Sequence, residues 1–193
     1  MQNNSAKYSS PVQIPGTTWS KIDNGRKFSV AIKTDGTLWS WGYGYNGNLG
    51  QNTNTNAHKS SPVQVGSDTT WSTVKSGNYG MIAVKTDGTL WAWGNNSYGD
   101  LGQNTAGNPT HRSSPVQITS GTDWNDVAVS MQTRWANKTD GTLYGWGRGD
   151  GGSLWNGTDS ANRSSPTQLQ GGATDFTGAL SSSYGRAVFN VRN

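Results

Sequence analysis

The sequence contains no cysteine and no glutamate, and it has few aliphatic residues. Without cysteine, a disulfide framework, a thiolate metal site and a cysteine nucleophile are excluded. Leu, Ile, Val and Phe number 27 of 193 residues, or 14%, a share typical of disordered chains. The net charge of +4 is, however, lower than such chains usually carry. Ten Trp and seven Tyr supply large apolar surfaces, so we expect a folded core rich in aromatic residues.

Long apolar segments are also missing. No run approaches the length of a transmembrane helix, so we expect no membrane insertion. The first residues, MQNNSAKYSSPVQIPG, lack the apolar segment of a secretory signal peptide. The 15 basic residues exceed the 11 acidic residues only slightly, which predicts mild affinity for anionic surfaces and does not favour nucleic acid as the partner.

An internal repeat dominates what is present. Its landmarks recur every 51 to 53 residues: Ser-Ser-Pro begins at 9, 60, 113 and 164, and Thr-Asp-Gly-Thr-Leu begins at 34, 86 and 139. A period of this length is typical of propellers and solenoids, in which each unit buries its faces against its neighbours. We predict one repeat domain, 1–193, with units at about 9–59, 60–112 and 113–163 and an incomplete unit at 164–193.

Each unit is expected to form four short strands. In the second unit these are SSPVQV, 71–74, 81–85 and 89–93. The Asp-Gly pair between the last two strands indicates a tight hairpin turn. No segment shows a sustained period of 3.6 residues, so we expect essentially no helix. The pattern predicts an all-β protein, a β-propeller with four-stranded antiparallel blades.

The motifs TDGTLWSWG, LGQN and SPVQV resemble the repeat of the regulator of chromosome condensation family. The resemblance covers nearly the whole chain and implies a propeller, usually of seven blades. Known members include an exchange factor for a small GTPase, an inhibitor of β-lactamases, and many bacterial and phage proteins. This chain holds about 3.5 units, or 15 of the 16 strands of a four-bladed ring. We therefore expect about four blades, or a partial ring that oligomerisation completes.

The recurring aromatic residues are expected to form the core between blades, with sugar-stacking platforms as the alternative interpretation. They are Trp19, Trp71, Trp124, Phe176, Trp39, Trp91, Tyr144, Trp41, Trp93 and Trp146. The recurring Asp-Gly pairs are expected to shape turns by local backbone bonding, rather than to pair as catalytic carboxylates. They are Asp35 with Gly36, Asp87 with Gly88, and Asp140 with Gly141.

Catalytic motifs are absent from the sequence. It has no GxSxG elbow and no phosphate-binding loop ending in GK[ST]. His58 and His111 occupy the same repeat position, which favours loop residues copied with the repeat; a two-histidine metal or pH-sensing site is the alternative. We predict that the protein is not an enzyme and holds no metal and no cofactor.

Three long connections carry the predicted binding surface. Residues 43–59, 95–112 and 148–163 join equivalent strands, so all three should lie on one face, with similar beginnings and different tips. Trp155 replaces the glycine of the other two loops and is a candidate contact residue. The basic residues before each Ser-Ser-Pro are either solvated charges or a site for an anionic partner. The candidate binding residues are Trp155, His58, His111, Lys59, Arg112, Arg163, Tyr43, Tyr45 and Tyr98.

These observations predict a non-catalytic propeller that works by binding. The resemblance and the composition favour a phage virion or prokaryotic surface component, such as a fibre, tail or capsid-decoration subunit. Its expected partners are proteins, including further copies of itself and other assembly subunits, with a glycan or an anionic surface as further candidates. The expected location is the virion or the cell surface. The alternatives are a lectin-like carbohydrate-binding module and a soluble protein-binding regulator, either an inhibitor or an exchange factor.

Overall fold

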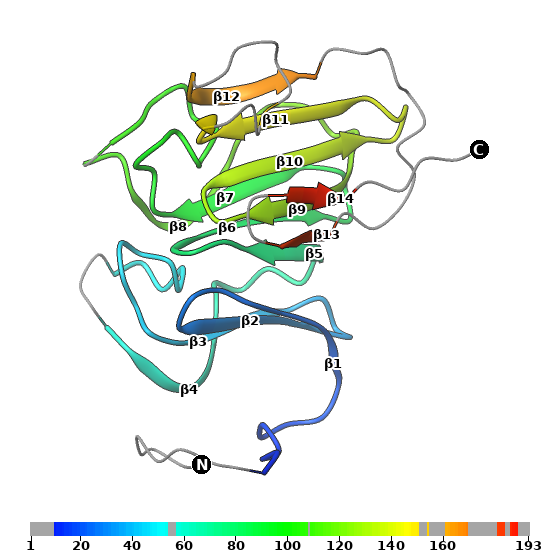
Figure 1. The fold of residues 1–193 in the computed structure, drawn as a ribbon. Coiled ribbons are helices and arrows are strands. Elements are labelled where there is room, and N and C mark those ends of the chain that lie inside the picture. Colours follow the sequence, from blue (N-terminus) through cyan, green and yellow to red (C-terminus); the bar gives the residue numbers. More distant parts are fainter. Residues whose placement is uncertain are drawn as a thin grey trace.

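The fold is a stack of small antiparallel sheets (Figure 1). The computed structural model describes residues 10–53, 57–107, 109–150, 154, 161–169, 181–183 and 186–188. These residues form three four-stranded sheets and one two-stranded sheet, and they contain no α-helix. The expected all-β fold with four-stranded antiparallel blades is therefore confirmed.

Each four-stranded sheet is one blade whose strands follow one another in chain order. Blade 1 contains β1 (Trp19–Asn24), β2 (Phe28–Lys33), β3 (Leu38–Gly42) and β4 (Lys59–Gln64). Blade 2 contains β5 (Trp71–Ser76), β6 (Gly80–Lys85), β7 (Leu90–Gly94) and β8 (Arg112–Gln117). Blade 3 contains β9 (Trp124–Ser130), β10 (Thr133–Lys138), β11 (Leu143–Gly147) and β12 (Arg163–Gln168). The two-stranded sheet contains β13 (Ser181–Ser183) and β14 (Arg186–Val188).

The sheets start one strand later than the sequence units. The Ser-Ser-Pro segment that opens a sequence unit pairs with the preceding TDGTLW-type strand, as in Trp39 opposite Gln64 and Gly42 opposite Lys59. It is therefore the outer strand of the preceding blade. The first such segment differs, because its described part, residues 10–14, lies in no sheet and the side chain of Val12 is 52% exposed.

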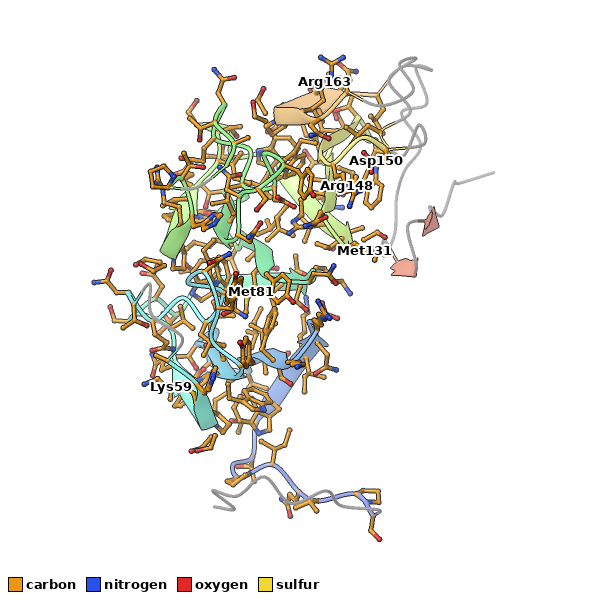
Figure 2. The ribbon with its side chains drawn as sticks, turned by 60° about the vertical axis from the view of Figure 1, so that its left-hand side comes forward. Lys59, Met81, Met131, Arg148, Asp150 and Arg163 are labelled. Atoms are coloured by element: carbon orange, nitrogen blue, oxygen red, sulfur yellow. The ribbon has the colours of Figure 1, made fainter. Side chains whose placement is uncertain are left out.

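The blades stack through the strands that begin each sheet. β5 contacts β1 and β2, β9 contacts β5 and β6, and β13 contacts β9. The arrangement is an arc that does not close on itself (Figure 1), which confirms the partial ring among the two expected architectures. In Figure 2, side chains fill the space between the sheets, and Met81 lies between blades 1 and 2.

The core lies between consecutive blades. Val30, Leu38 and Leu49 of blade 1 pack against Trp71 and Trp93 of blade 2. The second seam repeats this packing one blade further on and includes Trp124, Trp146 and the half-buried Tyr144. Aromatic residues thus supply the apolar surface that aliphatic residues supply in most cores.

Blade 1 leaves unburied the positions that the other blades bury. Ile22 is 55% exposed, whereas its repeat equivalents Val74 and Val127 are 3% and 0% exposed. Trp41 is half-buried, whereas Trp93 and Trp146 are fully buried. The reason is that no described blade precedes blade 1. Trp19, Trp39 and Trp91 are also half-buried, and Phe176 lies outside the described residues.

The two edges of the blades form two different surfaces of the arc. One edge, here called the loop face, carries the turns between the first two strands of each blade and the long connections that lead to β4, β8 and β12 (Figure 1, left). The opposite edge, here called the turn face, carries the Asp-Gly turns and the links between blades. The long connections thus gather on one face, where the antiparallel order of the strands places them.

Candidate functional site: the loop face

The turn face repeats one scaffold structure three times. The Asp35 carboxylate accepts hydrogen bonds from the Thr37 amide at 3.0 Å and from the Thr37 hydroxyl at 2.7 Å, and that hydroxyl accepts a bond from the Trp39 indole. These hydrogen bonds hold the pKa of Asp35 below its usual value. Asp87 with Thr89 and Asp140 with Thr142 form the same pair of bonds. The recurring aspartates are therefore occupied in shaping turns.

Glycine follows each of these aspartates for steric reasons. Gly36 has a φ of +77°, and a Cβ at this position would lie 2.0 Å from the Thr69 carbonyl oxygen of the link between blades. Gly88 and Gly141 share the positive φ. Only glycine combines this conformation with this approach of two backbones.

The recurring lysines of the turn face lie against the aromatic residues. The Lys33 ammonium is 4.0 Å from the centroid of the Trp39 ring and 5.0 Å from that of Trp19. Lys85 and Lys138 lie in the same way over the aromatic pairs of blades 2 and 3. Such cation–π contacts fix the lysines as part of the scaffold.

On the loop face, each long connection is closed by one hydrogen bond at the same position. The His58 Nδ1 accepts a bond from the Gly44 amide at 3.1 Å, and the His111 Nδ1 accepts one from the Asn96 amide at 3.0 Å. In the third connection the side-chain oxygen of Asn162 takes this role. A ring nitrogen that accepts an N–H carries no proton of its own, so the loop bond uses the free lone pair of Nδ1.

The loops are also pinned to the next blade. The Asn52 amide donates to the Ser113 carbonyl at 2.8 Å, and the Asn104 amide donates to the Ser164 carbonyl at 2.6 Å. Both asparagines have a positive φ, near +55°. The corner of each loop, at Asn52 in the first and at Asn104 in the second, thus hydrogen-bonds the outer strand of the following blade.

The buried indoles add a second bond at each pin. The Trp93 Nε1 donates to the Asn48 carbonyl at 3.0 Å, and the Trp146 Nε1 donates to the Asp100 carbonyl at 3.1 Å. Trp41 occupies the equivalent position in blade 1, but no loop corner in the described part of the chain reaches it. Where a blade follows, the long loop is therefore held rigidly against it.

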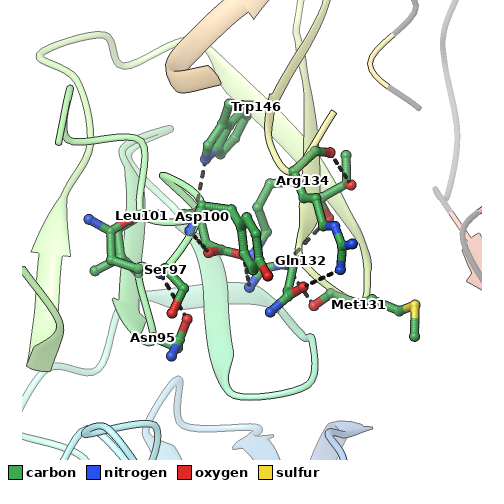
Figure 3. A network of polar contacts seen from close by, with 12 residues as sticks. Asn95, Ser97, Asp100, Leu101, Met131, Gln132, Arg134 and Trp146 are labelled. Carbon is green, nitrogen blue, oxygen red and sulfur yellow. Dashed lines mark hydrogen bonds and ion pairs between the residues drawn. The ribbon is translucent and has the colours of Figure 1, made fainter. Parts of the chain in front are cut away.

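An ion pair is buried beneath the corner of the long connection in blade 2 (Figure 3). The Asp100 carboxylate lies 3.7 Å from the Arg134 guanidinium, and both side chains are 1% exposed. Burial raises the pKa of Asp100 despite the attraction of Arg134. At the first seam the equivalent residues are Asn48 and Met81, so this pair distinguishes one seam from the other.

A row of exposed and half-buried rings spans the loop face at the seam of blades 1 and 2. The His58 ring stacks on Tyr43 with centroids 4.3 Å apart, and Tyr43 stacks on Tyr45 at 6.3 Å. Tyr45 then meets Tyr79 of the next blade at 5.2 Å. The row therefore draws on a long connection and on the short turn between β5 and β6.

Two cations flank this row. The Arg26 guanidinium donates to the Tyr79 hydroxyl at 2.6 Å and lies 5.7 Å from the centroid of that ring. The Lys27 ammonium lies 5.7 Å from the Tyr43 ring centroid. Together with the row, the two form a surface that we call the loop-face cluster. Its members are Arg26, Lys27, Tyr43, Tyr45, His58 and Tyr79.

The structure gathers only some of the candidate binding residues. Tyr43, Tyr45 and His58 meet in the loop-face cluster, whereas Tyr98 lies beneath Arg148 at the second seam, 5.0 Å from ring centroid to guanidinium. His111 holds its own loop. Lys59, Arg112 and Arg163 each begin an outer strand, and Figure 2 shows Lys59 and Arg163 far apart. Trp155 lies outside the described residues.

Sequence reasoning missed three members of the loop-face cluster, namely Arg26, Lys27 and Tyr79. They lie in the short turns after β1 and β5, which the repeat does not mark. One signal was available, because the corresponding turn of blade 3 carries Met131 and Gln132 instead, so side chains there vary between copies.

Among the described residues, no group of three His, Asp or other metal-ligating side chains is placed to hold a metal ion. The same residues contain no helix long and apolar enough to cross a membrane.

Two models of the regulator of chromosome condensation (RCC1) repeat match the chain, one over residues 35–84 and 87–132 and the other over 19–48 and 71–100. The E3 ubiquitin-protein ligase HERC2 of Homo sapiens is 31% identical over 153 residues, which cover 76% of this chain and 3% of HERC2. The ultraviolet-B receptor UVR8 of Arabidopsis thaliana is 27% identical over 162 residues, covering 83% of this chain and 36% of UVR8.

Yeast RCC1 (Prp20), solved with Kap60 bound to it, superposes with a TM-score of 0.74 at 19% identity, over 90% of this chain and 42% of Prp20. This likeness confirms the propeller fold. The chain spans less than half the length of each of these three proteins.

Proposed function

Because the chain belongs to the regulator of chromosome condensation (RCC1) repeat family, we propose that it is a non-catalytic propeller module that binds another protein through its loop face. The observation that carries the proposal is a contrast between the backbone and the side chains of the long loops. The hydrogen bonds that hold the first two long loops are the same in each, whereas the side chains that the loops expose differ.

The exposed residue three positions after the third strand differs in each copy: it is Tyr45 in blade 1, Ser97 in blade 2 and Asp150 in blade 3. A rigid frame lowers the entropy cost of binding, and different side chains on it give specificity. Tyr, together with Trp and Arg, is among the residue types most enriched at the hot spots of protein interfaces. The binding of Kap60 by yeast RCC1 supports a protein as the partner.

Site-specific photo-crosslinking tests this proposal. A photoreactive phenylalanine analogue is placed at Tyr45 on the loop face, and in a matched variant at Thr70 on the turn face; both residues are exposed. In an extract of the source organism, we expect Tyr45 to give a discrete protein adduct that excess unlabelled protein competes away. Adducts of equal yield from Thr70, or none from Tyr45, would contradict the assignment of the face.

The placement of this module in a phage virion or a prokaryotic surface assembly stays a prediction, supported by the resemblance and by the composition. It requires the protein to copurify with intact particles or with the cell envelope. Its absence from both fractions, by immunoblotting, would overturn the placement without affecting the loop face as a binding surface.

We also propose that a second copy of the chain covers the unburied face of blade 1, which completes the partial ring or extends it. The argument is continuity, since two seams of the same chain bury the equivalents of Ile22 and Trp41 against a preceding blade. A second copy brings a further blade of this kind, and head-to-tail contacts of this type generate rings or filaments.

A further inference from the structure

The loop-face cluster carries positive charge that no acidic residue in the described part of the chain balances through an ion pair. Within the described ranges, none of the ion pairs includes Arg26 or Lys27, and both side chains are exposed. The acidic residue nearest in the chain, Asp23, is already bonded, because its carboxylate accepts the Ser76 amide at 2.6 Å and the Ser76 hydroxyl at 2.9 Å. The two cations are therefore available to an anionic ligand.

The aromatic row offers edges and hydroxyl groups, because its rings cover one another. His58, Tyr43 and Tyr45 stack in sequence, with interplanar angles of 25° and 27°. Faces occupied in this way are poor platforms for nucleic-acid bases or sugar rings, which need an open aromatic face. Each tyrosine also carries a phenol hydroxyl, which can donate a hydrogen bond to a carboxylate. The Tyr79 hydroxyl accepts its bond from Arg26, which leaves its own proton to donate.

The spacing of the row matches an extended peptide. The centroids of the tyrosine rings are 6.3 Å and 5.2 Å apart along the row. Alternate residues of an extended chain are about 6.6 Å apart and point to the same side. Carboxylates at every second residue of such a chain would therefore come close to successive members of the row and its flanking cations.

From this charge, stacking and spacing we propose that the loop-face cluster binds an extended acidic segment of the partner protein, with its alternate carboxylates facing Arg26, Lys27 and the tyrosine hydroxyls. The inference rests on the proposed function and adds the chemistry of the partner to it. The cluster is specific to the first seam, because blade 2 has Asn95 and Ser97 where blade 1 has Tyr43 and Tyr45.

The test is a titration of the 193-residue protein against a fluorescein-labelled peptide of alternating Asp and Ser, followed by fluorescence anisotropy at low and at raised salt. The counterpart has Asn in place of Asp. We expect the Asp peptide to bind, its affinity to fall with salt, and the Asn peptide to bind at least about tenfold more weakly. Equal affinity for the two peptides would overturn the proposal.

A charge-matched pair of variants locates the site. Arg26→Gln with Lys27→Gln removes two charges from the cluster, and Arg112→Gln with Arg163→Gln removes two charges from the outer strands of the same face. We expect the first pair to weaken binding about tenfold and the second less than about twofold, since only the first contacts the ligand. Equal losses would indicate unspecific attraction and would overturn the proposal. Arg26 and Lys27 are exposed turn residues whose contacts with Tyr79 and Tyr43 lie at the surface, so the melting temperature of the first pair should stay within a few degrees of the wild-type value.

Two further outcomes separate this inference from the proposed function. A labelled oligothymidylate that binds more tightly than the Asp peptide, and loses binding in the Arg26→Gln, Lys27→Gln variant, would make the ligand a nucleic acid and overturn the proposal. A protein adduct at Tyr45 whose cross-linked segment carries no acidic residues would overturn only the acidic segment. The absence of any adduct on the loop face would overturn the proposed function itself.

Discussion

Asp100 and Arg134 illustrate at the residue scale how two seams of one repeat differ. Burial costs this pair more than it does an exposed one, since both charges leave water, and the raised pKa of Asp100 reflects that cost. At the first seam the equivalent positions hold Asn48 and Met81, which carry no charge. The first seam therefore shows which uncharged residues can replace the ion pair of the second seam.

From this comparison of the two seams we predict how substitutions of Asp100 and Arg134 change the free energy of unfolding. Asp100→Asn or Arg134→Met alone leaves one charge buried without its partner, and each should lower the free energy of unfolding by about 3–5 kcal/mol. The double variant should lose no more than about 2 kcal/mol, because it reproduces the first seam. Urea denaturation of the four proteins measures the coupling. Additive losses in the double variant would contradict this account of the pair.

The shifted pKa of His111 leads us to expect that the free energy of unfolding depends on pH. Burial lowers the pKa of His111, although Asp100 opposes the shift. The unfolded chain therefore takes up a proton at higher pH than the folded protein does. Stability from this group is complete above its unfolded pKa of about 6.5 and is lost as the pH falls towards the lowered folded pKa. Asn at this position, as in the third loop, should abolish this part of the loss.

The measurement is the free energy of unfolding from pH 8 to pH 5 for the wild-type protein and for His111→Asn. We expect the two curves to diverge below about pH 6.5, with the wild-type protein falling more steeply. Parallel curves across this range would show that the loop does not depend on the neutral ring.

At the scale of the element, the corner of each long loop combines a special backbone conformation with a tight contact. Gly50 has a φ of +68°, and a Cβ there would lie 2.9 Å from the Trp93 Nε1 atom. Gly66 has a similar φ of +62°, but a Cβ there would meet nothing within 4 Å. The two glycines therefore separate the cost of the conformation from the cost of the contact.

We expect Gly66→Ala to lower the free energy of unfolding by about 1 kcal/mol, from the backbone conformation alone. Gly50→Ala should cost a further 1–3 kcal/mol or so, because the added methyl group displaces the buried indole. Chemical denaturation compares the two variants directly. Equal losses would show that the corner is not packed tightly against the next blade.

The elements themselves were predictable from the sequence, because alternation and Asp-Gly turns act within one hairpin. Strands β5, β6 and β7 lie where the second unit predicted them. The loop-face cluster was only half predictable. Tyr43, Tyr45 and His58 lie in a loop that the repeat marks as long, whereas Tyr79 joins them from the next blade. That contact depends on how two blades stack, and local sequence patterns do not encode it.

The whole molecule is an open arc, and its first blade exposes surface that the other two blades bury. A face with Ile22 exposed and Trp41 only half-buried favours association. We predict that native mass, measured by light scattering, rises with protein concentration. Ile22→Asp should hold the protein at the mass of one chain. Met131→Asp is the matched control, because Met131 is similarly exposed at 52% but lies on the loop face. A single-chain mass at all concentrations would contradict self-association.

We propose that side chains shared by all copies hold the blades together, whereas side chains that differ on the loop face bind the partner. Replacing Tyr43 and Tyr45 with Asn and Ser, the residues of blade 2, tests this most directly. The measurement is the binding isotherm of this variant for the acidic peptide. We predict a loss of affinity of about tenfold or more, with unfolding unchanged within about 1 kcal/mol. Unchanged affinity in a folded variant would contradict the account.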